Sequence, residues 1–238
     1  MPDFKQRSAG TEIMDDLGSS GADLNQALRE LETINYLLGG NYVTLNGLAQ
    51  LLEKCERSPG LHIVDLGCGS GEMLKLIRKW LDKKKIPASL TGIDANKNVV
   101  RYAREHTPEA CRIQFESINI FSDIFRTRNF DIVTGTLFFH HFTSDQLVSF
   151  FAQLKNRTSI GWVINDIHRH SLAYYSIKWL TQIFSRSSMV KHDAPQSVLR
   201  AFKKIELSEI MRRAGILHYR IRWRWAFRWQ LIARFYGN

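Results

Sequence analysis

The sequence predicts an α/β fold, a doubly wound and mostly parallel sheet with helices on both faces. Three observations lead to this prediction. Short apolar runs alternate with stretches of helical periodicity between residues 61 and 164, and such alternation indicates βαβ units. A glycine-rich turn directly follows the first of these runs. The last segment, 220–235, alternates mostly apolar side chains with arginines at a period of two, which is typical of a strand.

The expected elements follow in chain order. An irregular arm reaches to about Gly21, because Gly, Ser and Asp are frequent there without apolar periodicity. Apolar residues at helical spacing predict a helix over 22–38, which Gly39 and Gly40 end. Thr44 is expected to cap a second helix. The strands predicted after it are 61–66, 89–93, 113–116, 130–134 and 159–164, and the helices are 72–81, 98–105, 143–154, 171–184 and 207–213.

The size and charge of the chain limit the classes of function that it can have. A chain of 238 residues with 44% hydrophobic side chains has material for one sizeable core. The net charge of +10 suggests an anionic partner, which can be nucleic acid, an acidic membrane surface or a phosphorylated ligand. Cys55, Cys68 and Cys111 lie far apart without CxxC spacing, so neither a disulfide framework nor a zinc site is indicated. With no apolar leader and no long apolar run, we expect a soluble cytoplasmic protein.

The segment HIVDLGCGSGE places Gly67, Gly69 and Gly71 between the first strand and the next helix. Glycine lets the backbone turn tightly there and approach a ligand without a Cβ in the way. Taken alone, such a segment is equally a plain strand-to-helix turn. Here Asp65 precedes GxGxG spacing, unlike the GxGxxG of dinucleotide-binding proteins, and its carboxylate suits a positively charged ligand. Asp94 ends the second strand, where its two oxygens can accept both hydroxyls of a ribose.

These residues resemble those of the class I S-adenosylmethionine-dependent methyltransferases, particularly the small-molecule branch that includes the ubiquinone and menaquinone type. The resemblance covers 61–164 by motif and extends to the tail by element order. It implies S-adenosyl-L-methionine as cofactor, with its methionine portion on the glycine loop and its ribose on the acid after the second strand. Asn119 stands where the family usually has Asp, and its carbonyl oxygen can still accept from the adenine amino group. The expected cofactor-binding residues are Asp65, Gly67, Cys68, Gly69, Gly71, Asp94, Ala95, Asn119, Ile120, Gly135 and Thr136.

The resemblance also completes the predicted fold. Domains of this family end in an antiparallel hairpin, so we expect a seven-stranded sheet with its last two strands in the C-terminal tail. An N-terminal arm and helices over 1–55 are expected to cover the active site, and a Rossmann-like methyltransferase domain is expected over 56–238. A helical insertion at about 171–202 is too long for a plain connection, so it is expected to cover the site as well.

Two pairs of histidines follow the fourth and fifth predicted strands, at the sheet edge where parallel α/β folds bind ligands. His168, His170 and His141 are candidates for a general base, because imidazole titrates near neutrality, and we prefer His168. Structural roles are the alternative: His140 or His141 can pack under the next helix, and the later pair can cap one. No metal is expected, since H-x-H on an irregular turn is not a diagnostic ligand spacing and Asp166 is the one carboxylate nearby.

Aromatic residues near these histidines predict the acceptor site. Tyr174 and Tyr175 lie on the helix after the fifth strand, where the family often has its acceptor-binding lid. Trp225 and Phe227 lie near the expected hairpin turn, at the same end of the sheet. We expect these four residues to line a closed, apolar substrate pocket, although a stripe of aromatics on a helix belongs to the core more often than to a pocket.

The tail RIRWRWAFRWQLIAR permits two interpretations. Its arginines and aromatics could bind phosphates and stack on bases, but we favour a structural hairpin with apolar residues facing the helices and arginines covering the other side. The NPPY-type tetrapeptide of enzymes that methylate base amino groups is absent, since Gly135–Phe138 stands there.

The hypothesis is O-methylation of a small hydrophobic acceptor, a phenolic, polyketide-like or quinol compound. An RNA or DNA methyltransferase and a non-catalytic cofactor-binding module are the alternatives. Peripheral membrane contact through the basic surface is a further expectation, and the sequence leaves the oligomeric state open.

Overall fold

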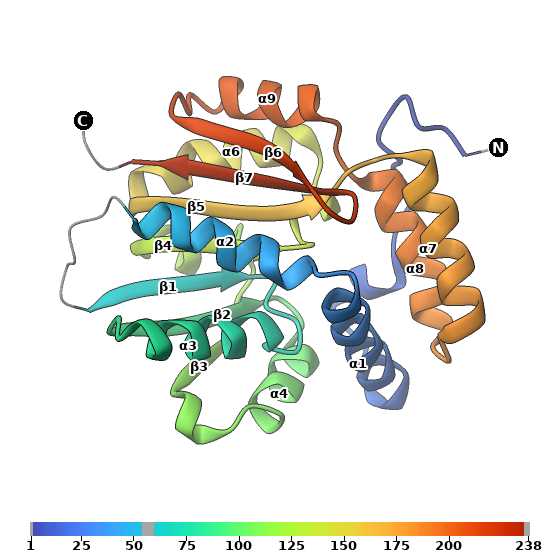
Figure 1. Cartoon of the computed structure of the whole chain (residues 1–238), viewed down its shortest axis with the longest axis horizontal. Helices are drawn as coiled ribbons and strands as arrows, with labels where there is room; N and C mark the ends of the chain where they lie inside the picture. The colour runs from blue at the N-terminus through green and yellow to red at the C-terminus, as the bar shows by residue number, and fades with distance from the viewer. Residues whose placement is uncertain (1, 54–59, 236–238) are drawn as a thin grey trace.

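The computed structural model describes residues 2–53 and 60–235, so Cys55 and the expected boundary near residue 55 lie outside the described residues. A seven-stranded sheet forms the centre of the molecule (Figure 1). Its strands are β1 (Leu61–Leu66), β2 (Ala88–Asp94), β3 (Ile113–Ser117), β4 (Phe130–Thr136), β5 (Thr158–Ile167), β6 (Tyr219–Arg224) and β7 (Arg228–Arg234).

Helices surround this sheet. They are α1 (Gly21–Leu37), α2 (Gly40–Leu52), α3 (Glu72–Lys84), α4 (Lys97–Glu105), α5 (Asp123–Arg126), α6 (Ser144–Leu154), α7 (Ser171–Phe184), α8 (Ser188–Arg200) and α9 (Lys204–Arg213). Two short 3-10 turns, Ile13–Asp15 in the N-terminal arm and Phe139–His141 after β4, matter for the site. Within the described residues, no helix is long and apolar enough to cross a membrane.

The strand order is β3-β2-β1-β4-β5-β7-β6. The first five strands pair in parallel, whereas β7 is antiparallel to both β5 and β6. The predicted fold class, a mostly parallel seven-stranded sheet with an antiparallel C-terminal hairpin, is therefore confirmed. The order reverses between β1 and β4, and the crevice beyond the carboxyl ends of such strands is where doubly wound folds bind ligands.

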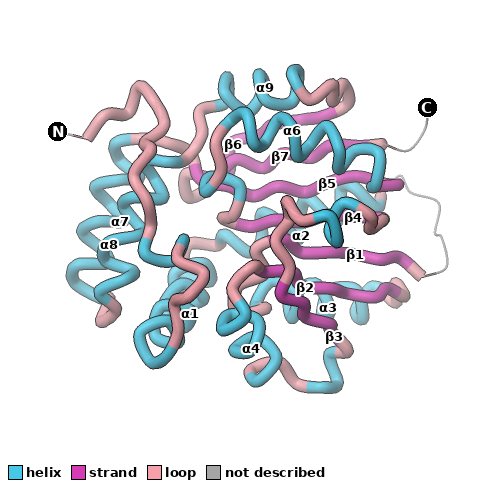
Figure 2. The backbone as a smooth tube through the Cα atoms, turned by 180° about the vertical axis from the view of Figure 1, so that it is seen from behind, coloured by secondary structure: helices cyan, strands magenta, loops and turns pink. Residues whose placement is uncertain are grey.

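Both faces of the sheet are covered, which explains why its central strands are apolar almost throughout. On one face, α6 and α9 pack against a cluster that includes Phe151 and Trp162. On the other face, α2 and α3 pack against a cluster that includes Ile63 and Val163. Figures 1 and 2 show these two layers from opposite sides. Trp162 and Val163 are neighbours on β5 that point to opposite faces, as the period of two requires.

A helical cover stands beyond the carboxyl ends of the parallel strands, where Figure 1 shows α1, α7 and α8 together. Leu24 and Leu28 of α1 pack against Val190 of α8. The N-terminal arm is fastened to the same helix, because the backbone N–H groups of Ile13 and Met14 donate to the Asp193 carboxylate at 2.8 and 3.0 Å. Two segments far apart in sequence thus close over one edge of the sheet.

The start of α2 differs from the prediction. The helix begins at Gly40, directly after Gly39, which is left-handed at φ +68°. These glycines join two helices without a loop, so Thr44 lies inside α2 and does not cap it. Its hydroxyl instead pairs with the hydroxyl of Thr136 at 2.8 Å and accepts from the Asn165 amide at 3.1 Å.

The hairpin has its turn between Arg224 and Arg228, close to where the alternation placed it. Its apolar side joins the core under α6 and α9. On the arginine side Arg222 is exposed, but α2 packs over the other arginines: Arg224 donates to the Asn46 side chain at 2.9 Å and Arg234 to the Gln50 backbone oxygen at 2.7 Å. Arg228 is buried and donates to the Asn35 side chain at 2.8 Å.

Candidate active site

A cavity of about 660 Å³ lies beyond the carboxyl ends of β1, β2 and β4 and is bounded by the arm, α1 and α8. Small-molecule sites usually have ~300–1,000 Å³. Gly71 and Gly135 are not among the lining residues. The other expected cofactor-binding residues line the cavity: Asp65, Gly67, Cys68, Gly69, Asp94, Ala95, Asn119, Ile120 and Thr136.

The three glycines after β1 are all left-handed, but for different physical reasons. At Gly67, with φ +64°, a Cβ would lie 2.1 Å from the Phe138 ring. At Gly71, with φ +76°, it would lie 2.7 Å from Phe115. At Gly69, with φ +52°, it would meet nothing within 4 Å. Gly67 and Gly71 therefore allow close packing, whereas Gly69 presents bare backbone to open space in the cavity.

Gly135 resembles the packing glycines, since a Cβ there would lie 2.5 Å from the Phe139 ring. Asn119 lines the cavity, but its side-chain oxygen already accepts from the N–H of Phe121 at 2.9 Å. A carbonyl oxygen has two lone pairs, so one acceptor site of Asn119 is still free for a ligand amino group.

Two carboxylates lie beside the glycine loop. Asp65 is buried and accepts from the Thr134 hydroxyl at 2.6 Å, and burial together with the nearby Asp94 charge raises its pKa to about 6. Burial likewise raises the pKa of Asp94. The backbone N–H groups of Asn96 and Gly69, which donate to its two oxygens at 3.0 and 3.3 Å, lower this pKa but do not outweigh burial. Because burial disfavours both negative charges, a ligand that carries positive charge would be stabilised here.

The chain leaves β4 through a strained residue. Leu137 has φ +56°, which is rare for a side chain of this kind, and its N–H donates to the Asn165 backbone oxygen at 2.8 Å. This turn places the Phe138 ring over Gly67. It also directs the 3-10 turn Phe139–His141 toward the end of the neighbouring strand β5.

Asp166 of β5 holds this turn in place. Its carboxylate accepts from the backbone N–H groups of Phe139, His140 and Ile167 at 2.9, 3.1 and 2.8 Å, and it pairs with Nδ1 of His140 at 2.7 Å. Burial is the largest single influence on the pKa of Asp166 and by itself would raise it. His140 and the backbone donors together outweigh burial, so the pKa lies below its ordinary value. An ionised carboxylate accepts a hydrogen bond, so Nδ1 of His140 carries a proton and Nε2 is the nitrogen that faces away from Asp166.

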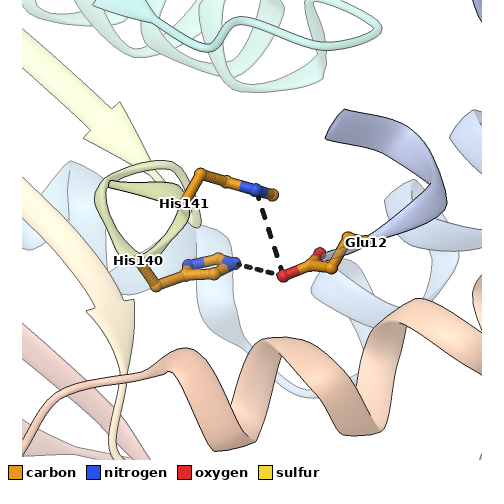
Figure 3. Close-up of side chains that lie close together, drawn as sticks. All are labelled: Glu12, His140 and His141. Carbon is orange, nitrogen blue, oxygen red and sulfur yellow. Dashed lines mark ion pairs between the residues drawn. The ribbon is translucent and has the colours of Figure 1, made fainter. Parts of the chain in front are cut away.

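Glu12 of the arm faces this histidine (Figure 3). Its Oε1 lies 3.6 Å from Nε2 of His140 and 3.9 Å from Nδ1 of His141, while its Oε2 accepts from the Ser197 hydroxyl at 2.7 Å. Among the described residues, neither Oε1 of Glu12 nor Nε2 of His140 has a hydrogen-bond partner, although both atoms are buried. Burial raises the pKa of Glu12. Buried polar atoms are rarely left unpaired, and exceptions indicate a functional role or a missing ligand.

His141 and Arg200 complete the cluster. Nδ1 of His141 pairs with Asp15 at 2.7 Å, and Arg200 contacts the carboxylate of Asp15 and lies 3.4 Å from Oε1 of Glu12. In the described part of the chain, Glu12, His140 and His141 form the group whose ligand atoms are close enough to share a metal ion. The guanidinium of Arg200 already supplies a cation beside Glu12, so a metal ion there would be repelled by it.

The structure places the other candidate bases away from the cavity. The sequence ends the fifth strand at residue 164, but β5 continues to Ile167 and pairs with β7 as far as Arg228. His168 therefore meets the hairpin: its N–H donates to Phe227 at 2.8 Å and its ring packs on Trp229. His170 caps α7 by accepting from the N–H of Leu172 at 3.1 Å. Of the three candidate bases, His141 is the one among the lining residues.

The four aromatic residues expected in the substrate pocket do not line the cavity either. Tyr174 packs edge-on against Phe4 of the arm, and Tyr175 is exposed. Trp225 is exposed in the hairpin turn, and Phe227 stacks on the His170 ring. The cavity wall is made instead by the arm, α1 and the segment after β4.

Sequence reasoning missed His140 and Glu12 as site residues. A usable signal existed for His140, because β4 and β5 pair in parallel, with Thr136 opposite Asn165, so that the residues after both strands meet. No such signal existed for Glu12, since the arm has no periodicity and its position depends on contacts with α8.

A family model described as a methyltransferase domain matches residues 63–161. Among curated proteins, trans-aconitate 2-methyltransferase of Delftia acidovorans (strain DSM 14801 / SPH-1) is 39% identical over 62 residues, which are 26% of this chain and 22% of that protein. The match therefore spans less than a quarter of that relative's length.

Solved structures of methyltransferases share the fold. Human N-acetylserotonin methyltransferase in complex with SAM has a TM-score of 0.62 at 15% identity, over 90% of this chain and 56% of that one. The plantazolicin methyltransferase in complex with SAH has 0.60 at 20% identity, over 84% and 77%. Magnesium protoporphyrin IX methyltransferase from Synechocystis PCC 6803 with bound SAM has 0.59 at 14% identity, over 95% and 99%.

The family model runs from β1 to β5, which is the part of the sheet that carries the glycine loop and both carboxylates. The shared fold extends this likeness over most of the chain. Residues 63–161 thus match a methyltransferase domain, and over most of its length the chain has the fold of methyltransferases whose structures hold SAM or SAH.

Proposed function

We propose that this protein methylates a hydroxyl oxygen of a small hydrophobic acceptor, a phenolic, polyketide-like or quinol compound, with His140 as the general base. The observation that carries the proposal is the buried Asp166–His140 pair in the same cavity as the glycine loop and Asp94. This assignment moves the base from His168 to His140, because His168 packs against the hairpin.

The cofactor site has the features that its ligand requires. Asp94 is proposed to accept from the ribose hydroxyls and Gly69 to let the methionine portion approach the backbone. Ala95, Asn119 and Ile120 are proposed to surround the adenine. Asp65 lies next to these groups with a charge that burial disfavours, so it suits the positive end of the ligand. When bound, S-adenosylmethionine supplies a methyl group on a positively charged sulfur.

The residues around His140 provide what methyl transfer to a hydroxyl needs. Nε2 takes the proton of the acceptor hydroxyl, which leaves the oxygen lone pair available for bond formation with the methyl carbon. The Asp166 carboxylate stabilises the imidazolium that results and keeps the ring oriented. Since Nε2 and Oε1 of Glu12 are 3.6 Å apart, one oxygen atom can lie within hydrogen-bond distance of both. Glu12 is therefore proposed to position the acceptor hydroxyl.

The surroundings favour an apolar acceptor. Phe121, Leu137, Phe138 and Phe142, which come from the segments after β3 and β4, line the cavity. The arm contributes Met14. Because Nε2 of His140 is buried and Glu12 of the arm lies 3.6 Å from it, the Glu12 side chain or the arm must shift when the acceptor binds, and its return excludes water from the methyl group. We propose this covering role for residues 2–52, with α8 as the anchor of the arm.

The hairpin gives little support to a nucleic-acid substrate. Arg224, Arg228 and Arg234 are engaged with side chains or backbone of the α1–α2 region, so these guanidinium groups are not available for phosphates. A binding module without activity is separated from an enzyme by the experiment below.

The test compares His140→Asn with His168→Asn, using a panel of hydroxylated aromatic acceptors and measuring methyl transfer with labelled cofactor. His140→Asn is expected to lower kcat about 10²–10⁴-fold, the usual contribution of general-base catalysis. Cofactor affinity by calorimetry should stay near that of the wild type, because the exchange does not alter Asp94 or the glycine loop. His168→Asn serves as the matched control and should keep near-normal kcat.

Full activity of His140→Asn, or an equal loss in His168→Asn, would remove His140 from the mechanism. If the wild type binds the cofactor but transfers no methyl group to any acceptor of the panel, the hydrophobic hydroxyl acceptor is refuted. A non-catalytic module then becomes the better interpretation.

A further inference from the structure

The outer side of α7 carries an apolar stripe that the fold does not use. Leu172, Tyr175, Trp179 and Ile183 are all between 52% and 71% exposed. Their spacing of three, four and four residues places them within about 80° of the helix circumference. Ala173 and Thr181, on the opposite side, are the buried residues of α7. The helix therefore has a second apolar face that points away from the protein.

The hairpin extends this surface. Trp225, at the turn, is 68% exposed and Trp223 on β6 is 47% exposed. The turn lies beside the start of α7, because Phe227 stacks on His170 with ring centroids 5.4 Å apart and contacts Trp223 at 6.2 Å. Figures 1 and 2 both show the hairpin turn near α7, at the same end of the molecule. We call Leu172, Tyr175, Trp179, Ile183, Trp223 and Trp225 together the aromatic face.

Exposed basic side chains lie near the aromatic face. Of the four basic residues within 168–192, Arg169 is buried against Glu206, whereas Lys178 and Arg186 are exposed. Lys178 precedes Trp179 on α7, and Arg186 follows the end of the helix, where its backbone N–H donates to the Glu30 carboxylate at 2.9 Å. Arg222 is exposed too, but it alternates with Trp223 on β6 and points to the other face of the sheet. An exposed apolar surface of this extent usually marks a contact site. The exposed cations Lys178 and Arg186 favour a partner that carries negative charge.

Trp and Tyr next to Lys and Arg form the composition of helices that lie in a membrane interface. With 14 residues, α7 is about 21 Å long, too short for the ~30 Å hydrocarbon core but suited to lie along its surface. None of the residues of the aromatic face lines the cavity described above.

We propose that the aromatic face docks this protein on an anionic lipid surface. Trp179 and Trp225 enter the interface between headgroups and acyl chains, while Lys178 and Arg186 bind the lipid phosphates. The docking surface is distinct from the residues proposed for methyl transfer, so its test does not depend on the acceptor.

The experiment measures sedimentation of the full chain with vesicles of phosphatidylcholine alone or mixed with phosphatidylglycerol. The wild type should bind the mixed vesicles, and salt should weaken the binding because it screens the charges. The double variant Trp179→Glu with Trp225→Glu should lose at least tenfold in partition coefficient. Lys178→Glu with Arg186→Glu should lose about fivefold or more. Circular dichroism checks that the variants fold.

The matched control is Ile205→Glu with Leu217→Glu, which places the same charges at equally exposed apolar residues on and after α9. It should bind like the wild type. No binding of the wild type to anionic vesicles, or equal loss in this control, would overturn the proposal. The proposal would also be overturned if the wild type forms a dimer in sedimentation velocity, the Trp variant is monomeric, and neither protein binds vesicles. The aromatic face would then join two copies of the chain. Binding of oligonucleotides in place of vesicles through the same residues would also overturn it.

Discussion

Gly67 and Gly69 are two residues apart and both left-handed, yet their replacement by alanine should affect different properties: mainly the stability of the fold at Gly67 and mainly ligand binding at Gly69. The left-handed conformation costs a residue with a Cβ about 1–2 kcal/mol at either position. At Gly67 the new Cβ would also lie 2.1 Å from the Phe138 ring. This ring is itself packed against Phe139 and Phe142 at centroid distances of 5.3 and 5.1 Å, so it has little room to move.

Overpacking of such a site costs about 1–3 kcal/mol, so Gly67→Ala should lower the free energy of unfolding by about 2–5 kcal/mol in total. At Gly69 no atom lies within 4 Å of the added Cβ, so Gly69→Ala should lose only the backbone part, about 1–2 kcal/mol. The Cβ at Gly69 would instead project into the cavity proposed to hold the cofactor. It should therefore weaken cofactor binding at least tenfold.

Urea unfolding without ligand and calorimetry with S-adenosylhomocysteine measure the two effects separately. The difference in unfolding free energy between the variants isolates the contact with Phe138, since the backbone part is shared. Equal destabilisation by both variants would refute the packing role of Gly67. Unchanged ligand affinity of Gly69→Ala would refute the close approach of the ligand to this backbone.

Asp94→Ala should abolish cofactor binding in calorimetry while the fold persists; unchanged affinity would contradict its role toward the ribose. Asp65 has its pKa raised to about 6 in the folded chain, so its contribution to stability is largest below pH 4 and is lost as the pH rises through 6. Asp65→Asn should therefore raise the unfolding free energy of the ligand-free protein at pH 7 by on the order of 1–3 kcal/mol, and it should weaken cofactor binding. A difference in unfolding free energy between variant and wild type that does not change with pH in urea unfolding would argue against this. Asp193→Ala removes the acceptor for the N–H groups of Ile13 and Met14, so protease cleavage within the arm should accelerate several-fold, and an unchanged rate would mean that other contacts hold the arm.

The elements of the sheet were predictable because each has a local signature. Strand β1 begins and ends where its apolar run does, and α7 has its predicted bounds Ser171–Phe184. The errors fall where tertiary contacts replace local rules. Pairing with β7 lengthens β5 to Ile167, and two adjacent glycines start α2 at Gly40, before the residue expected to cap it.

The part of the site proposed to bind the cofactor could also be predicted from the sequence, for a similar reason. Asp65 and Asp94 follow consecutive strands of a parallel sheet, and the carboxyl ends of such strands meet at one edge. Residue type and strand position together therefore placed these residues near a common ligand before any contact was known.

The acceptor side was decided by the tertiary structure. Glu12, His140 and Asp166 come from an arm without periodicity, a 3-10 turn and a strand end, and they are joined only by side-chain contacts across long stretches of chain. Side-chain contacts also decide the position of His168, which packs on Trp229 of the hairpin and does not line the expected pocket. The sequence by itself determined the sheet and the cofactor edge, because short-range patterns encode them. Only the folded chain decided which imidazole faces the cavity, because a strained turn and a buried carboxylate orient it.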